Sequence, residues 1–201
     1  MIKTIAFDME GVLILSKKRR IQEKIAKKFN IKKENWIEII RPIIKLSSKG
    51  KITKKETLNS IKKILEENIK KLKDALEDFY TKSYNINRGM LNLSKKLKKK
   101  GYKVIIISNL GYIAKEILVD NKNMSHFNKK VISCEAKLSK PEKEIFQMAL
   151  KKSNTKSNEM IFIDNLESNI KAAEKLGIKS ILFKNNRQII NDLKNLGIGL
   201  K

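Results

Sequence analysis

Residues 3–13, which read KTIAFDMEGVL, combine a predicted first strand with two acids and a glycine directly after it. The run Lys3–Phe7 is short and mostly apolar, which is typical of a strand buried in a sheet. Two acids, Asp8 and Glu10, follow this strand directly, and Gly11 then permits the backbone to curl away from it. Because ligands of open α/β sheets bind beyond the carboxyl ends of the strands, we expect a functional site at this tip.

Four more short apolar runs predict further strands at Tyr102–Ile107, Lys130–Ser133, Met160–Ile163 and Ser180–Phe183. Longer amphipathic stretches with helical spacing occur at Asn87–Lys100, Pro141–Lys152 and Leu166–Leu176. Gly101 and Gly177 stand where helices end, and Pro141 stands at a first helical turn. Apolar strands that alternate with amphipathic helices predict the α/β class, with a three-layer, Rossmann-like parallel-sheet core.

Residues 17–84 interrupt this alternation, because they hold no convincing strand and at least three helical patterns. Apolar residues recur there at helical spacing in three sets: Ile21, Ile25 and Phe29; Trp36, Ile39, Ile40 and Ile43; and Leu58, Ile61, Ile64 and Leu65. Gly50, Thr53 and Glu56 predict a loop and a capping box before a new helix. The pattern indicates a small all-helical cap at 17–84, inserted after the first strand of a core formed by 1–16 and 85–201.

Composition excludes several classes of protein. The chain has 201 residues, 41% of them apolar and 33% charged, which suits one domain with a modest insertion. Cys134 is the only cysteine and His126 the only histidine, so a disulfide scaffold, a zinc finger and an HExxH-type zinc protease are excluded. No run approaches the roughly 18 apolar residues of a membrane span, and Lys3, Asp8 and Glu10 break the first apolar stretch. We therefore expect a cytoplasmic protein with no membrane partner.

The formal net charge is +25, from 46 Lys+Arg against 21 Asp+Glu. Arginine occurs only at positions 19, 20, 41, 88 and 187, so lysine supplies nearly all of the positive charge. Proteins that read phosphates and base edges rely on the planar fork of arginine. We interpret the charge as a solvated surface with a general attraction for anions, and we expect no specific nucleic acid partner. A lysine-rich nucleic-acid-associated protein is the alternative, and its binding would weaken steeply with salt.

Polar residues follow the predicted strands where each strand ends. They are Asp8 and Glu10 after the first strand, Ser108 and Asn109 after Tyr102–Ile107, Lys140 in the loop after Lys130–Ser133, and Asp164 and Asn165 after Met160–Ile163. Because the carboxyl ends of parallel strands meet at one edge of a sheet, we expect these side chains to surround one site.

The acids in this set fit phosphoryl transfer through an aspartyl intermediate. Asp8 can attack phosphorus and form an acyl phosphate, which divides one difficult step into two. Glu10 can protonate the leaving oxygen and later deprotonate water. Mg²⁺ bound by Asp8 and Asp164 would offset the repulsion between the nucleophile and the phosphate oxygens.

The remaining polar residues fit the binding of phosphate. Ser108 would donate a hydrogen bond to a phosphoryl oxygen, and Lys140 would neutralise charge on both the phosphate and Asp8. Backbone amides at the helix start after Asn109 would add anion stabilisation. We therefore predict Ser108 and Asn109 as substrate-binding residues and Lys140 as part of the catalytic set.

Four stretches carry these residues, in the order FDMEGVL at 7–13, VIIISNLG at 104–111, SKPEKEIFQMAL at 139–150 and FIDNLESNIKAAEKLGI at 162–178. Together they resemble the motifs of the haloacid dehalogenase-like (HAD) superfamily of hydrolases, in the subgroup with a helical cap between the first two motifs. The resemblance covers residues 3 to about 183. It implies Asp8 as nucleophile, Glu10 as general acid/base, Ser108 as phosphate ligand, Lys140 as the charge-balancing lysine and Asp164 as magnesium ligand. It also implies that the main-chain carbonyl of Glu10 joins the metal shell.

The chain departs from the family pattern at two positions. The first motif is usually Asp-x-Asp, whereas this chain has Asp8-Met9-Glu10, which resembles a minority of family phosphatases of the enolase-phosphatase type. The longer side chain of Glu10 still permits proton transfer and could narrow the substrate range. Asn165 stands where many members carry a second aspartate, so we expect weaker magnesium affinity.

Other polar and aromatic residues are open to two interpretations. Trp36, Arg41 and Lys45 of the predicted cap are candidate substrate contacts, although a tryptophan at helical spacing is usually part of a core. We interpret His126 and Cys134 as structural.

We therefore predict a magnesium-dependent phosphatase that acts on a small phosphorylated metabolite, as a monomer or homodimer. The fold also hosts dehalogenases and phosphomutases, since fold does not determine function. Dehalogenases of this kind need no magnesium and lack an acid two residues past the nucleophile, so Glu10 and Asp164 favour phosphate chemistry. A non-catalytic binding protein, in which Glu10 and Asn165 mark a decayed site, is a further alternative.

Overall fold

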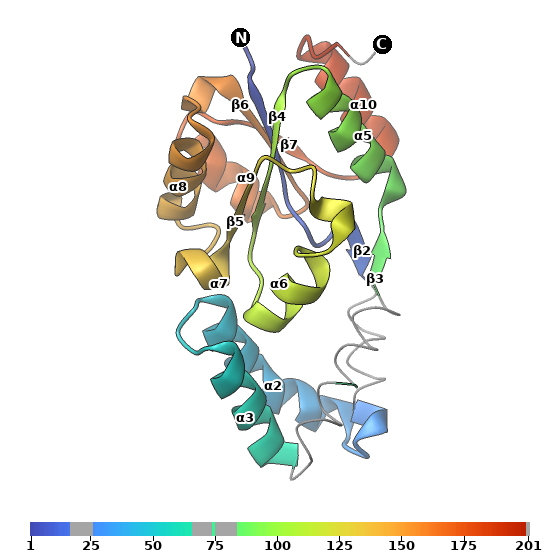
Figure 1. Ribbon diagram of the computed structural model, residues 1–201, viewed down its shortest axis with the longest axis vertical. Helices are drawn as coiled ribbons and strands as arrows, with labels where there is room; N and C mark the ends of the chain where they lie inside the picture. Colours follow the sequence, from blue (N-terminus) through green and yellow to red (C-terminus); the bar gives the residue numbers. More distant parts are fainter. Residues whose placement is uncertain (17–25, 66–73, 75–83, 200–201) are drawn as a thin grey trace.

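The protein is seen here as a computed structural model that describes residues 1–16, 26–65, 74 and 84–199. Its centre is a parallel sheet of five strands in the order β5-β4-β1-β6-β7 (Figure 1). The strands are β1 (Thr4–Phe7), β4 (Lys103–Ser108), β5 (Lys129–Ile132), β6 (Met160–Asp164) and β7 (Lys179–Leu182). All five predicted strands are confirmed to within one residue at either end. The α/β class and the parallel sheet are likewise confirmed.

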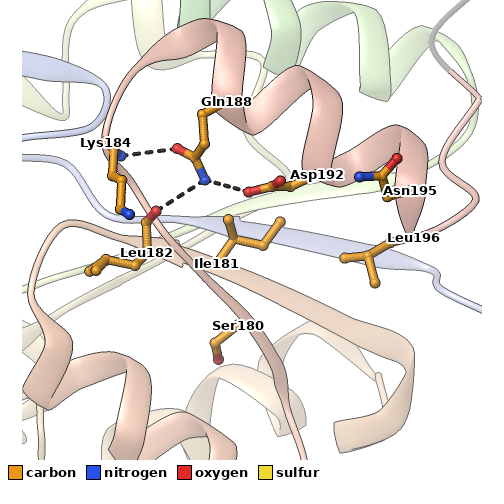
Figure 2. Close-up of a pocket in the computed structure, with 8 residues that line it drawn as sticks. All are labelled: Ser180, Ile181, Leu182, Lys184, Gln188, Asp192, Asn195 and Leu196. Carbon is orange, nitrogen blue, oxygen red and sulfur yellow. Dashed lines mark hydrogen bonds between the residues drawn. The ribbon is translucent and has the colours of Figure 1, made fainter.

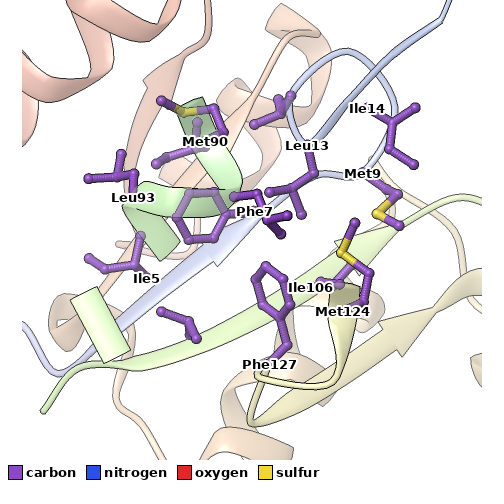
Figure 3. Packing of buried hydrophobic residues seen from close by; sticks show 14 of the residues in the cluster. Ile5, Phe7, Met9, Leu13, Ile14, Met90, Leu93, Ile106, Met124 and Phe127 are labelled. Carbon is purple, nitrogen blue, oxygen red and sulfur yellow. The ribbon is translucent and has the colours of Figure 1, made fainter. Parts of the chain in front are cut away.

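Each strand alternates its side chains between two apolar clusters because neighbouring residues of a strand face opposite sides. Ile5 and Phe7 of β1 belong to one cluster, which extends to Met90, Leu93 and Phe127 (Figure 3). Ala6, Ile105, Ile107 and Phe162 belong to the other cluster. The sheet is therefore buried on both faces, which explains why its strands are continuous apolar runs.

Helices supply the outer layers. α5 (Arg88–Lys99), α6 (Tyr112–Leu118) and α10 (Asn186–Asn195) contribute to the cluster of Ile5 and Phe7. α8 (Lys143–Ser153) and α9 (Glu167–Glu174) contribute to the opposite cluster. The short helix α7 (Ser133–Ala136) follows β5 directly, and two 3₁₀ turns cover Lys122–Met124 and Ser157–Glu159. The sequence predicted α5, α8 and α9 and a helix start after Asn109, where α6 follows, but it did not predict α7 or α10.

The predicted position of Pro141 is wrong by two residues. α8 begins at Lys143 and its N-cap is Glu142, so Pro141 lies before the helix. The amide of Glu142 donates to the carbonyl of Ser139 at 2.8 Å, which closes a turn over residues 139–142 ahead of the helix. Gly101 and Gly177 have positive φ angles of 88° and 78° after α5 and α9, as expected for glycines that end helices.

Two of the three helical patterns predicted after the first strand are confirmed as helices. α2 (Lys33–Ser48) and α3 (Lys54–Leu65) form the helical insertion, which has its own small core around Trp36, Ile40 and Ile61. The predicted capping box is confirmed, because the amide of Thr53 donates to Glu56 at 2.7 Å and the amide of Glu56 donates to Thr53 Oγ1 at 3.2 Å. Ile21 and Ile25, from the first predicted helical pattern, lie outside the described residues.

Two short strands flank the helical insertion in the sequence. β2 (Ile14–Ser16) and β3 (Tyr84–Ile86) pair in an antiparallel ribbon that the sequence did not predict. The division into a core of 1–16 and 85–201 and a cap of 17–84 stays a prediction. Among the described residues, no helix is both apolar enough and long enough to cross a membrane.

α2 and α3 lie beyond α6 and α7, at the end of the molecule opposite both termini (Figure 1). α6 and α7 follow the carboxyl ends of β4 and β5, so the helical insertion lies on the side of the sheet to which the strands point. Gly50 touches this part of the core closely, since a Cβ added there would lie 2.3 Å from the carbonyl oxygen of Cys134.

Candidate active site

Three neighbouring strands bring their last residues together. Asp8 follows β1, and its amide donates to the carbonyl of Ile163 in β6 at 2.9 Å. Ser108 ends β4 and Asp164 ends β6, on the two sides of β1. The hydroxyl of Ser108 donates to Oδ1 of Asp8 at 2.8 Å. The order of the strands therefore places these three side chains at one edge of the sheet.

Lys140 joins the acids of this edge. Its Nζ lies 2.8 Å from Oδ1 of Asp8 and 2.6 Å from Oδ2 of Asp164. The side chains of Lys140, Asp8 and Asp164 are only 2%, 8% and 0% exposed. We call Asp8, Ser108, Lys140 and Asp164 the strand-edge cluster. Buried charges of this kind are stable only when they are paired and hydrogen-bonded.

The electrostatic balance of the strand-edge cluster is negative. Burial raises the pKa of Asp164 above its ordinary value, and the nearby Asp8 acts in the same direction, whereas Lys140 opposes the rise. Two carboxylates that share one ammonium leave one negative charge in excess when both are ionised. The arrangement therefore favours a further positive charge at this edge of the sheet.

Two groups that the sequence analysis missed hold Asp164 in place. The amide of Leu166 donates to Oδ1 of Asp164 at 2.8 Å, and Nδ2 of Asn169 donates to Oδ2 at 3.0 Å. Asn169 is buried in the first turn of α9. The sequence carried no signal for this contact, because asparagine also occurs in other helices of this chain.

Glu10 lies in a tight turn directly after β1. The amide of Gly11 donates to the carbonyl of Ile14 at 2.7 Å, and the amide of Ile14 donates to the carbonyl of Met9 at 2.8 Å. Gly11 has a φ of +94°, and a Cβ there would lie 2.5 Å from Cγ of Asn165. Both observations explain why glycine is needed, since a side chain would be strained and would collide with Asn165. Glu10 itself is partly buried.

Asn109 bonds to the main chain on both sides of Lys140. Its Nδ2 donates to the carbonyl of Lys140 at 2.8 Å, and its Oδ1 accepts from the amide of Lys140 at 2.9 Å. The next residue, Leu110, donates its amide to Oγ of Ser133 at 3.0 Å. The segment after β4 is thus joined to the segment after β5. The role of Asn109 as a substrate-binding residue stays a prediction.

The donor set at this edge fits Mg²⁺. Within residues 1–16, 26–65, 74 and 84–199, no group of three or more His, Cys, Asp and Glu side chains is arranged to hold a metal ion. Magnesium does not require such a cage, because it is usually bound by one or two carboxylates and completes its shell with waters and substrate phosphate. Asp8 and Asp164 supply two carboxylates close enough to share one ammonium, which meets this requirement.

The other residues singled out in the sequence lie in different surroundings. Trp36 is 1% exposed and stacks on Phe29 with ring centroids 6.5 Å apart, so it packs within the helical insertion. Arg41 and Lys45 are exposed on α2. Burial raises the pKa of the Cys134 thiol to about 11, which keeps it protonated and unreactive. His126 lies 2.8 Å from the buried hydroxyl of Ser94, and burial lowers its pKa.

A groove of about 470 Å³ lies elsewhere, between the edge strand β7 and α10 (Figure 2). Gln188 crosses it, accepting from the amide of Lys184 at 3.0 Å and donating to the carbonyl of Leu182 at 3.2 Å. No member of the strand-edge cluster lines this groove. It is therefore separate from the candidate active site.

A family model described as haloacid dehalogenase-like hydrolase matches residues 5–183. A stretch of 117 residues is 31% identical to bifunctional epoxide hydrolase 2 of Rattus norvegicus, covering 56% of this chain and 21% of that protein. The chain thus spans about a fifth of the length of this curated relative.

Solved structures resemble the whole fold. A HAD family enzyme from Bacteroides thetaiotaomicron is 30% identical, with a TM-score of 0.79 over 91% of this chain and 94% of that one. The same enzyme has been crystallised in complex with magnesium and inorganic phosphate, and in that form the TM-score is 0.77 over 92% and 95%. A predicted HAD-like family hydrolase from Porphyromonas gingivalis, 22% identical, has a TM-score of 0.80 over 99% of both chains and shares the fold.

Proposed function

The chain belongs to the haloacid dehalogenase-like hydrolase family, and from this we propose that it is a magnesium-dependent phosphohydrolase of a small phosphorylated metabolite. One observation carries the proposal. A single ammonium, that of Lys140, contacts two buried carboxylates, Asp8 and Asp164, beside the hydroxyl of Ser108. The Bacteroides thetaiotaomicron relative, which was crystallised with magnesium and inorganic phosphate, gives independent support.

Asp8 is the proposed nucleophile. A carboxylate oxygen of Asp8 attacks phosphorus, an oxygen–phosphorus bond forms, and the bond from phosphorus to the alcohol oxygen breaks. Glu10, two residues further on, gives its proton to the leaving alcohol. The products of this first step are the free alcohol and an aspartyl phosphate on Asp8.

Water completes the reaction in a second step. Glu10, now ionised, accepts a proton from water as the water oxygen attacks phosphorus. The bond between phosphorus and Asp8 breaks, inorganic phosphate leaves, and Glu10 is again protonated. No further reactant is needed, because the proton lent in the first step returns in the second.

The other residues of the strand-edge cluster stabilise charge. Ser108 donates to a phosphoryl oxygen, and Lys140 offsets the charge that builds up on phosphate and Asp8. Asp8 and Asp164, with the main-chain carbonyl of Glu10, would hold Mg²⁺, which supplies positive charge against the phosphate oxygens when bound. Asn165 is neutral, whereas a second aspartate at this position would add a negative charge. We therefore expect weaker magnesium binding than in family members that carry that aspartate.

The helical insertion is the proposed determinant of substrate choice. It lies on the side of the sheet to which the strands point, where a cap can exclude water from the reaction. Arg41 and Lys45 are exposed on α2 and stay candidate contacts for an anionic substrate. The net charge of +25 would raise the encounter rate with anions without selecting among them. We further propose a cytoplasmic monomer or homodimer.

Phosphate release from a panel of phosphomonoesters, with and without Mg²⁺, tests the proposal. The active protein should require Mg²⁺, and Asp8→Asn should lower kcat by about a thousandfold or more, because the nucleophile is lost. Asp120→Asn is the matched control, since this exposed acid pairs with Lys115 at 2.9 Å and lies outside the strand-edge cluster. The control should keep its activity.

The same assay separates the alternatives. A protein that binds Mg²⁺ and phosphate but turns over no member of the panel would be a non-catalytic binding protein. Halide release from 2-haloacids without Mg²⁺ would indicate a dehalogenase. Conversion of one phosphate ester into its isomer without free phosphate would indicate a phosphomutase.

A further inference from the structure

The side chain of Asn109 has both of its polar atoms engaged with one residue. Oδ1 accepts the amide proton of Lys140 at 2.9 Å, and Nδ2 donates to the carbonyl of Lys140 at 2.8 Å. A residue of a neighbouring antiparallel strand would bond to the amide and the carbonyl of Lys140 in the same way. Here a side chain provides both bonds. It reaches from the end of β4, next to Ser108, to a residue 31 positions further along the chain.

The segment that carries Lys140 has no regular secondary structure of its own. It runs from the end of α7 at Ala136 to the start of α8 at Lys143. Its first residue, Lys137, has a left-handed φ of 56°. The carboxylate of Glu142 accepts from the amide of Ser139 at 3.2 Å, and this bond holds the residue just before Lys140. The backbone of Lys140 itself is held by Asn109.

From this geometry we infer that Asn109 is a positioning residue, which fixes the main chain of Lys140 so that its ammonium reaches both Asp8 and Asp164. The inference rests on the proposed function for its kinetic consequences. Its structural part, that Asn109 and the ammonium of Lys140 are energetically coupled, can be measured without any substrate.

The physical reason is the length of the lysine side chain. Four methylene groups joined by rotatable bonds separate the backbone from Nζ. Nζ must nevertheless lie 2.8 Å from one buried carboxylate and 2.6 Å from another. A backbone that moved by about 1 Å would lengthen one of these contacts, and misplacement on this scale is costly for catalysis. The hydrogen bonds from Asn109, one on each side of the Cα of Lys140, prevent that movement.

Kinetics distinguish positioning from direct substrate binding. Asn109→Ala should lower kcat by about tenfold to a hundredfold, as loss of a supporting partner does around catalytic groups, with KM changed by less than about twofold. The probes are p-nitrophenyl phosphate for turnover and inorganic phosphate, titrated with Mg²⁺ present, for binding. Asn158→Ala, at an exposed asparagine in the turn before β6, is the matched control and should match the unmodified protein.

A stability cycle tests the coupling independently of activity. Unfolding in urea is measured for the unmodified protein, Asn109→Ala, Lys140→Met and the double variant. Lys140→Met keeps the main-chain bonds to Asn109 and removes only the ammonium. Asn109→Ala raises the equilibrium constant of unfolding by some factor in each background. If Asn109 acts through the ammonium, this factor should be about five times smaller in the Lys140→Met background than in the unmodified protein.

Two results would overturn the inference. Equal effects of Asn109→Ala in both backgrounds would show that its bonds are structural and do not serve the ammonium. A tenfold rise in KM and in the dissociation constant of phosphate, with kcat unchanged, would make Asn109 a substrate contact. Absence of turnover in the unmodified protein would remove the proposed function, and the stability cycle would still decide the coupling.

Discussion

The strand-edge cluster and the helical insertion are held in place by different kinds of contact. Three members of the cluster lie at the ends of adjacent parallel strands and Lys140 lies in the segment before α8, and the charged groups are almost fully buried and paired at 2.6–2.8 Å. The helical insertion meets the core through close packing, with Ile113 of α6 against its apolar cluster and Gly50 against the carbonyl of Cys134, and also through exposed ion pairs. Lys49 lies 3.3 Å from Glu142, and Lys54 pairs with Glu116, with side chains 39–55% exposed.

The two kinds of contact differ in how much free energy is lost when they are disturbed. The buried pairs of the strand-edge cluster cannot shift without exposing unpaired charge, so its side chains keep one geometry. Exposed ion pairs contribute little energy and can break and re-form, so those of the helical insertion hold it less firmly than its packed contacts do.

The largest expected effect comes from removing the cation of the strand-edge cluster. Lys140→Met should lower the free energy of unfolding by about 3–5 kcal/mol at neutral pH, because two buried carboxylates lose their shared partner. The loss should shrink as the pH falls, since burial already raises the pKa of Asp164 and protonation then relieves the unpaired charge.

Urea unfolding at several pH values measures this effect. Lys171→Met is the matched control, because Lys171 pairs with Glu167 at 3.3 Å and both side chains are about two-thirds exposed. The control should change stability by less than about 1 kcal/mol at any pH. A Lys140→Met protein as stable as the unmodified one would show that the buried pairs do not hold the cluster.

A smaller effect, confined to the helical insertion, is expected from Trp36→Ala. Trp36 is fully buried against Phe29 and Ile40, so the substitution should cost about 3 kcal/mol of local stability. Hydrogen exchange should accelerate in α2 and α3 and stay slow in β1 and β4. Trp36→Phe is the control, because it keeps an aromatic ring in the same core.

The opposite outcome would revise the role of Trp36. If Trp36→Ala left exchange in α2 and α3 unchanged and raised KM instead, the tryptophan would contact substrate, as its place in the predicted cap first suggested.

The smallest effect is expected from the surface ion pairs. The double variant Lys49→Ala with Lys54→Ala should change global stability by less than about 1 kcal/mol, because each pair is exposed. The KM of the double variant should depend on salt concentration less than the KM of the unmodified protein does. Salt screens the two exposed ion pairs, and the variant lacks them. A large fall in kcat would contradict the view that these pairs only affect the position of the helical insertion.

Much of the fold follows from local pattern. The five strands could be predicted because each is buried on both faces and is therefore a continuous apolar run. α10 was missed because only Ile189, Ile190 and Leu193 among its ten residues are apolar. β2 and β3 are three residues each and depend on one another, so neither had a signal of its own.

Much of the candidate site also follows from the sequence. That Asp8, Ser108 and Asp164 come together could be predicted, because parallel strands end at one edge. That Lys140 contacts Asp164 as well as Asp8, and that Asn169 bonds to Asp164, depended on side-chain directions that spacing does not encode.

The residue types at the tips of the strands follow from the sequence alone, since the apolar pattern marks where each strand ends. The partner that each polar atom takes depends on the tertiary structure. Asn109 follows Ser108 directly and could have faced a ligand, yet its amide turns to the main chain of Lys140. The reason is physical: a polar side chain bonds to whatever group the folded chain brings within about 3 Å, and that group is remote in sequence.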